Sequence, residues 1–130
     1  MSISIAEYKA MLKKGPKYKS KAVNADDKYF PSKFEAAVYQ VLYLRQKSGE
    51  FDEIERQVQI ELTAGITHKV DFVAKKNGER VLLIEAKGFE DNAWQLKKKL
   101  YKKFTKLPLE IWKGTHSKPF LSETILPKNF

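Results

Sequence analysis

The chain has 130 residues, 42% of them hydrophobic, which is enough for one core and too few residues for two ordinary domains. Charged residues make up 32%, and the formal net charge of +9 predicts a positive surface that attracts phosphate polymers, so nucleic acid is the first partner to consider. The absence of cysteine excludes disulfides, thiolate metal sites and thiol nucleophiles, and two histidines are too few for a histidine-rich site.

The N-terminal residues 1–29 are rich in lysine and contain only Glu7, Asp26 and Asp27 as acids, with Gly15-Pro16 interrupting any helix. We expect a basic arm here, which either follows a phosphate backbone or is simply solvated. The first residues lack the pattern of a signal peptide, and no apolar run approaches the roughly 20 residues of a membrane span. We therefore expect no membrane association and a cytoplasmic location.

Residues 30–130 are expected to form a single domain. Ser32 followed by Glu35 has the form of a capping box and predicts a helix that ends at Ser48-Gly49. Apolar residues then alternate with Gln57, Gln59 and Glu61 over 57–62, which predicts a half-buried strand, and a second strand is expected over 68–74.

A turn around Asn77-Gly78 leads into the aliphatic run 81–84, which is typical of a central strand covered on both faces. Residues 94–104 are helical in pattern, Pro108 stops that helix, and residues 109–112 form a last strand, expected to be parallel to the central one. The predicted class is therefore α/β, with a four-stranded mixed sheet flanked by helices.

Charged residues stand at sheet positions that would ordinarily be apolar. Asp71 interrupts its strand, and Glu85 and Lys87 follow the central run on one face, with Ala86 between them. Asp71, Glu85 and the backbone carbonyl of Ala86 are oxygen ligands of the kind that Mg²⁺ prefers, and Mg²⁺ relieves charge on a phosphoryl group and activates water. We expect Lys87 to orient that water or to stabilise the transition state, and Glu35 to support the site.

The register of the hairpin decides whether Asp71 shares a face with Glu85. A strict two-residue Asn77-Gly78 turn would place Asp71 opposite Ile84, on the wrong face. A three-residue loop with a glycine bulge would place Asp71 opposite Leu83, diagonal to Glu85. We therefore predict an odd-length loop.

The chain resembles the PD-(D/E)XK nuclease superfamily over residues 28–113, because Glu35, Asp71 and Glu85-Ala86-Lys87 follow in the same order on the same kinds of element. One difference is that Val70 stands at the position of the proline in the superfamily's motif. The phrases Phe30-Pro31-Ser32-Lys33-Phe34-Glu35 and Glu85-Ala86-Lys87-Gly88 are similar to small phage endonucleases and Holliday-junction resolvases of that superfamily. The resemblance implies a restriction-endonuclease-like αβββαβ core and a Mg²⁺-dependent DNA endonuclease, with Mn²⁺ as a substitute metal. It also implies selectivity for branched DNA in phage DNA processing and recombination, action in the bacterial host cytoplasm, and a homodimer, with no small-molecule cofactor beyond the metal.

Two alternatives stay open: a sequence-preferring nicking or homing-type endonuclease, and a non-catalytic nucleic-acid-binding module with the nuclease fold. Lysines on the second helix, with no acid between Gln95 and Leu109, are expected to bind phosphate rather than only to be solvated; they are Lys97, Lys98, Lys99, Lys102 and Lys103. Gln57 and His68 are weaker site candidates, because a regular strand would turn His68 to the other face. Trp94 and Trp112 are expected in the core.

Overall fold

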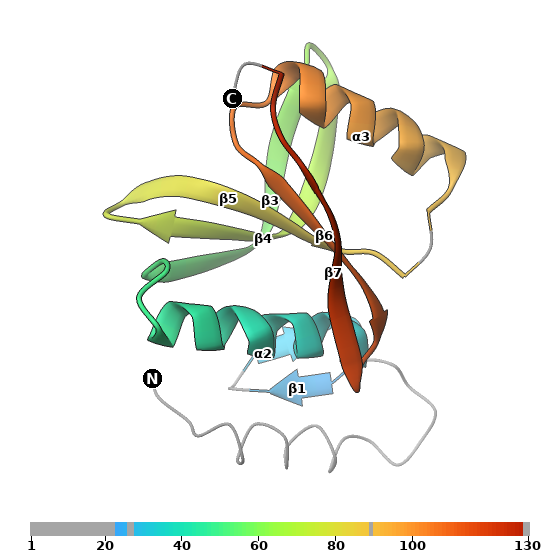
Figure 1. The fold of residues 1–130 in the computed structure, drawn as a ribbon. Helices are drawn as coiled ribbons and strands as arrows, with labels where there is room; N and C mark the ends of the chain where they lie inside the picture. The colour runs from blue at the N-terminus through green and yellow to red at the C-terminus, as the bar shows by residue number, and fades with distance from the viewer. Residues whose placement is uncertain (1–22, 26–27, 89, 129–130) are drawn as a thin grey trace.

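The computed structural model describes residues 23–25, 28–88 and 90–128, which form helices on both sides of a sheet (Figure 1). The elements in chain order are β1 (Val23–Ala25), β2 (Lys28–Phe30), α2 (Lys33–Lys47), β3 (Glu53–Thr63), β4 (Ile66–Lys76), β5 (Glu79–Ala86), α3 (Asn92–Phe104), β6 (Leu109–Thr115) and β7 (Lys118–Ile125). No helix of the described residues is both long and apolar enough to cross a membrane.

The main sheet is mixed and has five strands in the order β3-β4-β5-β6-β7. Only β5 and β6 are parallel, and α3 forms the crossover between them, so the expected strand-helix-strand unit and the α/β class are confirmed. The expectation of four strands was wrong, because residues 118–125 add β7 antiparallel to β6 at the edge of the sheet.

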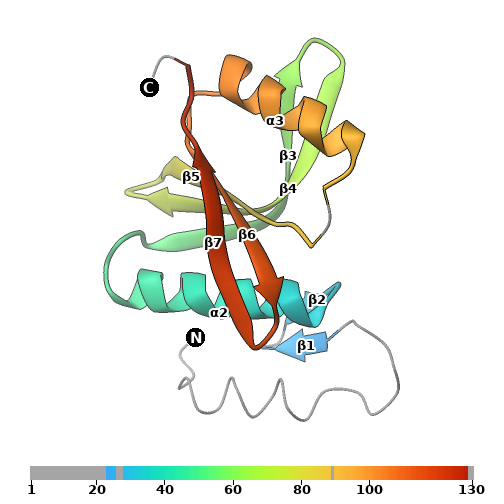
Figure 2. The ribbon, with the colours of Figure 1, turned by 45° about the vertical axis from the view of Figure 1, so that its right-hand side comes forward.

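Two apolar clusters lie on opposite faces of the sheet. One packs α2 against Phe72, Ala74 and Ile84, and the other packs Trp94 and Tyr101 of α3 against the opposite face. Figure 2 shows the same arrangement, with α2 and α3 on either side of the strands. Burial on both faces explains the aliphatic run in β5, whose residues 82–84 are all buried.

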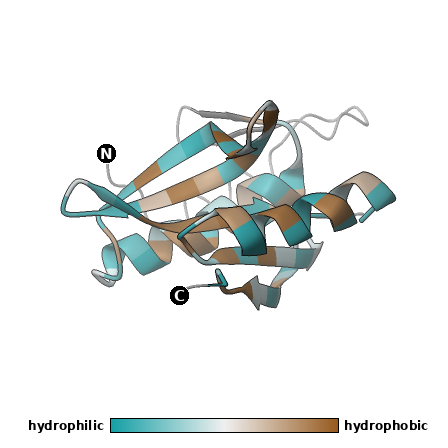
Figure 3. Ribbon diagram, turned by 90° about the horizontal axis from the view of Figure 1, so that it is seen from above, coloured by the Kyte–Doolittle hydropathy of each residue, from teal (hydrophilic) through white to brown (hydrophobic). Residues whose placement is uncertain are grey.

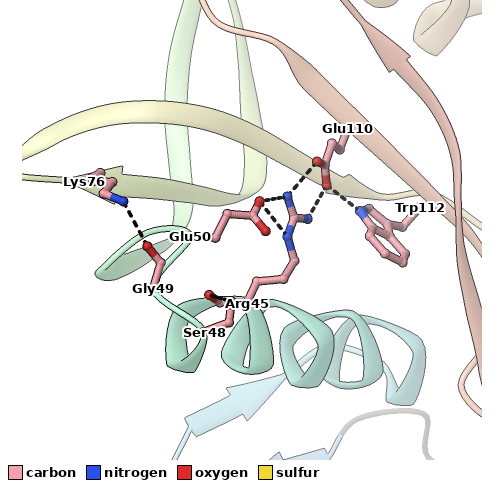
Figure 4. A network of polar contacts seen from close by, with 7 residues as sticks. All are labelled: Arg45, Ser48, Gly49, Glu50, Lys76, Glu110 and Trp112. Atoms are coloured by element: carbon pink, nitrogen blue, oxygen red, sulfur yellow. Dashed lines mark hydrogen bonds and ion pairs between the residues drawn. The ribbon is translucent and has the colours of Figure 1, made fainter.

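The helix α2 begins at the predicted cap, where the amide of Glu35 donates to Ser32 Oγ at 3.0 Å. Its last turn is tied to β6 by Arg45, which donates to both carboxylate oxygens of Glu110 at 2.7 and 2.9 Å. Figure 4 shows this network, in which Trp112 Nε1 also donates to Glu110 and the guanidinium reaches Glu50. The ion pair of Arg45 with the buried carboxylate of Glu110 therefore joins α2 to β6.

The turn between β4 and β5 has two residues, Asn77 and Gly78, both with positive φ, and it pairs Lys76 with Glu79. The prediction of an odd-length loop was therefore wrong. The extra residue lies further along β5 instead: Lys75 pairs with Arg80 but Ala74 pairs with Leu82, which leaves Val81 in a bulge.

A short antiparallel pair, β1 with β2, precedes α2 and registers Val23 with Phe30. Regular structure therefore begins before the helix that Ser32 caps, because extended residues 23–25 and 28–30 pair with each other. The basic-arm prediction for residues 1–22 and 26–27 lies outside the described residues.

Candidate active site

The strands β3 and β4 are irregular around Asp71. In a regular strand, residues two apart share a face, yet Val70 belongs to the α3-side cluster and Phe72 to the α2-side cluster. On β3, Arg56 pairs with Phe72 and Val58 pairs with Val70, so the residue facing Asp71 is Gln57. Its φ of 52° is left-handed, which is uncommon for a residue other than glycine. Asp71 therefore lies at an irregular point between the two faces.

Asp71 and Glu85 interlock where the β4–β5 ladder ends. The ladder runs to Phe72 paired with Ile84, and one further step in that register puts Asp71 opposite Glu85. Beyond the ladder, the Asp71 amide donates to Glu85 Oε1 at 3.1 Å and the Ala86 amide donates to Asp71 Oδ2 at 2.9 Å. The expected pairing of Asp71 with Leu83 was wrong, because the Val81 bulge shifts β5 and Leu83 pairs with Val73. The two carboxylates still come together.

Glu35 reaches the same place from α2. Its side chain is buried, and Gln57 Nε2 donates to Glu35 Oε2 at 3.0 Å and lies 3.4 Å from Asp71 Oδ1. Ser32 caps the helix through the backbone amide of Glu35, so the side chain remains available to the site. Glu35 therefore combines a place in the helix cap with a place in the site. Gln57, a weaker candidate from the sequence, lies between the carboxylates.

The three carboxyl groups carry more negative charge than their surroundings offset. Burial, followed by the charges of Glu85 and Glu35, raises the pKa of Asp71 to about 8. Burial also raises the pKa of Glu35, although the positive charge of Arg56 and the hydrogen bond from Gln57 oppose the shift. The pKa of Asp71 therefore lies well above that of an ordinary aspartate, and a cation that joins the cluster would lower it.

His68 lies beside Glu85, with its Nε2 2.9 Å from Glu85 Oε2. Its ring packs against Trp94 and Tyr101 of α3. The expectation that His68 faces away from the site was wrong, because it assumed a regular strand from His68 to Asp71 and the strand is irregular there.

Lys87 places its ammonium 4.6 Å from the centroid of the Trp94 ring, a cation–π contact. Its backbone amide donates to the carbonyl of Trp112 at 2.8 Å, which fixes the end of β5 against β6. Among the described residues the ammonium has no carboxylate partner. The Lys87 ammonium is thus held on the Trp94 ring, and among the described residues no carboxylate neutralises it.

The donor chemistry fits a hard divalent cation. Asp71, Glu85 and Glu35 offer carboxylate oxygens. Burial is the main cause of the raised pKa of Asp71, and the second cause is the negative charge of Glu85 and Glu35, which a cation would relieve. Within the described part of the chain, no three His, Asp or Glu side chains are already arranged as a metal-binding group. One oxygen of Glu85 accepts a hydrogen bond from the amide of Asp71, and one oxygen of Asp71 accepts a hydrogen bond from the amide of Ala86. These hydrogen bonds would give way to ligation when a cation binds. The ligand role of the Ala86 carbonyl stays a prediction.

The lysines of α3 divide into two groups. Lys98 is enclosed by acids, 2.9 Å from Glu90 and 2.6 Å from Glu123, and Glu90 also pairs with Lys113. These partners, Lys113 first, lower the pKa of Glu90 to about 2. Lys98 was expected to bind phosphate, but its ammonium instead pairs with Glu90 and Glu123 and so connects α3 to β7. The other lysines of the helix have no acidic partner among the described residues; they are Lys97, Lys99, Lys102 and Lys103.

Apolar and polar bands alternate along α3 in Figure 3, which reflects a buried aromatic side and an outer lysine side. Trp94 and Trp112 are buried, as predicted. Three features of the site were not predicted from the sequence: Arg56, Tyr101 and the contacts of Trp94. For Arg56 a signal existed, because it falls in the same alternating row as Val58 and Ile60, where an apolar residue is expected.

The chain was compared with known proteins. A family model described as "Protein of unknown function (DUF1064)" matches residues 15–118. No curated protein and no solved structure matches.

Proposed function

The chain belongs to the DUF1064 family, whose description names no activity, and from the geometry of its site we propose that it is a Mg²⁺-dependent DNA endonuclease. The proposal includes a restriction-endonuclease-like core of the PD-(D/E)XK type. The order α2, β3, β4, β5, α3, β6 supports it, because it repeats the αβββαβ order that the resemblance implies. In this proposal β7 is an addition at the edge of that core.

The observation that carries the proposal is the interlocked pair of Asp71 and Glu85, with Glu35 beside it. The three carboxylates come from two strands and a helix and meet at the end of a central strand. Burying this much like charge costs free energy, and a purely structural site gains nothing from it. A site that binds a divalent cation does gain, because the carboxylates are its ligands.

In the proposed reaction, Asp71 and Glu85 hold the cation, with the Ala86 carbonyl as a further ligand. Bound Mg²⁺ would supply charge relief at the scissile phosphate and lower the pKa of water. The ammonium of Lys87, held on the Trp94 face, orients the nucleophile or stabilises charge that develops on the phosphate. Glu35, which accepts a hydrogen bond from Gln57, is the third carboxylate beside Asp71 and Glu85.

The outer lysines of α3 support nucleic acid as the substrate. They have no acidic partner in the described part of the chain, so their charges repel one another unless they bind phosphate. We propose branched DNA, such as a Holliday junction, as the preferred form. Paired cuts in a junction need two sites, so the proposed active species is a homodimer.

The test incubates purified protein with four-way junction, duplex and single-stranded DNA, with Mg²⁺ or with EDTA. Cleavage is expected only with Mg²⁺, and Asp71→Asn and Glu85→Gln are expected to abolish it. The control is Glu61→Gln, which removes an exposed carboxylate from β3 outside the site. Cleavage in EDTA, or undiminished cleavage by Asp71→Asn, would overturn the proposal.

Two other outcomes favour the alternatives. Tight DNA binding without cleavage of any substrate in Mg²⁺ would indicate a non-catalytic binding module. Cuts at one sequence in plain duplex, with no preference for junctions, would indicate a nicking or homing-type enzyme instead.

A further inference from the structure

His68 makes a direct hydrogen bond to Glu85 that the proposed reaction does not use. Its Nε2 lies 2.9 Å from Glu85 Oε2, and the two side chains are only 12% and 5% exposed. A carboxylate oxygen accepts hydrogen bonds, so we assign to His68 the tautomer that carries a proton on Nε2 and donates to Glu85. The other oxygen, Glu85 Oε1, accepts the backbone amide of Asp71.

The ring of His68 is fixed by two aromatic residues of α3. Trp94 packs at 5.3 Å between ring centroids, and Tyr101 packs edge-on at 5.7 Å with an interplanar angle of 84°. Trp94 and Tyr101 are themselves fully buried. A ring held on two sides has a fixed direction for its Nε2–H bond, so the position of Glu85 Oε2 is fixed as well.

The two oxygens of Glu85 therefore differ. Oε1 is bonded to a backbone amide at the open end of the ladder, beside Asp71, whereas Oε2 points towards the aromatic side. We propose that His68 is a positioning residue that holds Glu85 by Oε2 and so presents Oε1 to a divalent cation. This inference rests on the proposed function, because it takes Glu85 as a metal ligand. Residues that hydrogen-bond a metal ligand typically affect metal affinity by about 10- to 100-fold when they are replaced.

Two substitutions separate the hydrogen bond from the packing. His68→Gln keeps an amide donor near the place of Nε2 but removes the ring, and His68→Phe keeps a ring between Trp94 and Tyr101 but removes the donor. Mn²⁺ binding to the protein without DNA, followed by electron paramagnetic resonance, gives a dissociation constant for each. The other histidine of the chain, exposed His116, provides the matched control His116→Gln.

We expect His68→Phe to weaken Mn²⁺ binding by about tenfold or more and to raise the Mg²⁺ concentration for half-maximal cleavage in parallel. His116→Gln is expected to bind Mn²⁺ as the wild type does, and His68→Gln, which keeps a donor without the ring, is expected to bind Mn²⁺ more tightly than His68→Phe. Should the larger ring of His68→Phe prevent folding, judged by near-ultraviolet circular dichroism, His68→Leu removes the donor with a smaller side chain and takes its place.

Unchanged Mn²⁺ affinity in a folded donor-free variant would overturn the inference. So would weak binding by His68→Gln with normal binding by His68→Phe, since packing and not the hydrogen bond would then matter. A wild type that binds Mn²⁺ but cuts no DNA would overturn the proposed function and leave the comparison of His68 variants intact. A wild type that binds no divalent cation would overturn both.

Discussion

Asp71 and Glu85 exchange hydrogen bonds across the open end of the β4–β5 ladder: the amide of Asp71 donates to Glu85 Oε1, and the amide next to Glu85, that of Ala86, donates to Asp71 Oδ2. The side chains replace the backbone carbonyls that would continue a regular ladder. Burial first, and then the nearby charges of Glu85 and Glu35, raise the pKa of Asp71.

The first prediction concerns stability against pH in EDTA. The pKa of Asp71 rises from 3.8 to about 8 on folding, so the folded state binds more protons than the unfolded state between these values. The stabilising contribution of its protonated form is fully present below pH 3.8 and is lost as pH rises through 8. Asp71→Asn removes this dependence, because its amide stays neutral.

We therefore expect Asp71→Asn to be more stable than the wild type in EDTA at about pH 8–9, with a smaller difference at about pH 5. Urea unfolding at several pH values measures this, with Glu61→Gln as the control. Added Mg²⁺ should stabilise the wild type and not Asp71→Asn. A variant less stable than the wild type at the alkaline end would contradict the assignment of a raised pKa to Asp71.

Lys87→Met is expected to lower the cleavage rate by about 100-fold or more, because in the proposed reaction this charge orients the nucleophile or stabilises the phosphate. Stability should change little, since the ammonium has no acidic partner among the described residues. Single-turnover cleavage and thermal unfolding measure the two effects. Lys69→Met, which replaces an exposed lysine of β4, is the control. Full activity in Lys87→Met would exclude a catalytic role.

Arg45→Met is expected to destabilise the protein by about 3–5 kcal/mol, because it leaves the carboxylate of Glu110 buried without its cation. The comparison is Arg80→Met, which breaks the exposed pair with Glu55 and is expected to cost about 1 kcal/mol or less. Urea unfolding of both variants gives the difference. Equal effects would mean that the network in Figure 4 contributes no more than a surface ion pair.

The lysines of α3 are expected to act differently in DNA binding. Lys102→Gln with Lys103→Gln should weaken binding and reduce the slope of log affinity against log salt by about 0.9 for each phosphate that is no longer neutralised. Lys98→Gln should leave that slope unchanged and lower the melting temperature, because it breaks the ion pairs with Glu90 and Glu123. Fluorescence anisotropy at several salt concentrations distinguishes them, and a reduced slope in Lys98→Gln would contradict its structural role.

Local sequence patterns predicted the elements that depend on periodicity and capping. The Ser32 cap, the buried run of β5 and the parallel strand after α3 follow from neighbouring residues alone. The fifth strand was missed because residues 118–125 have an irregular burial pattern at a sheet edge.

At the site, Asp71 and Glu85 could be grouped because charged residues at sheet positions need partners, whereas Glu35, on the helix, was expected only to support them. His68 could not be placed, since its direction depends on the irregular point at Asp71, and that irregularity involves the left-handed Gln57 on a different strand. Lys98 could not be separated from its neighbours, because its partners Glu90 and Glu123 lie in a loop and on the strand that was missed.

The bulge at Val81 means that the hairpin carries one residue more than its pairing requires. Deletion of Val81 would leave Arg80 and Leu82 adjacent and still paired with Lys75 and Ala74, so the site would keep its geometry. Straightening the bulge without such a deletion would slide β5 by one residue and bring Ile84 opposite Asp71. The hairpin can therefore lose one residue here without cost to the site, whereas an insertion would need a second bulge.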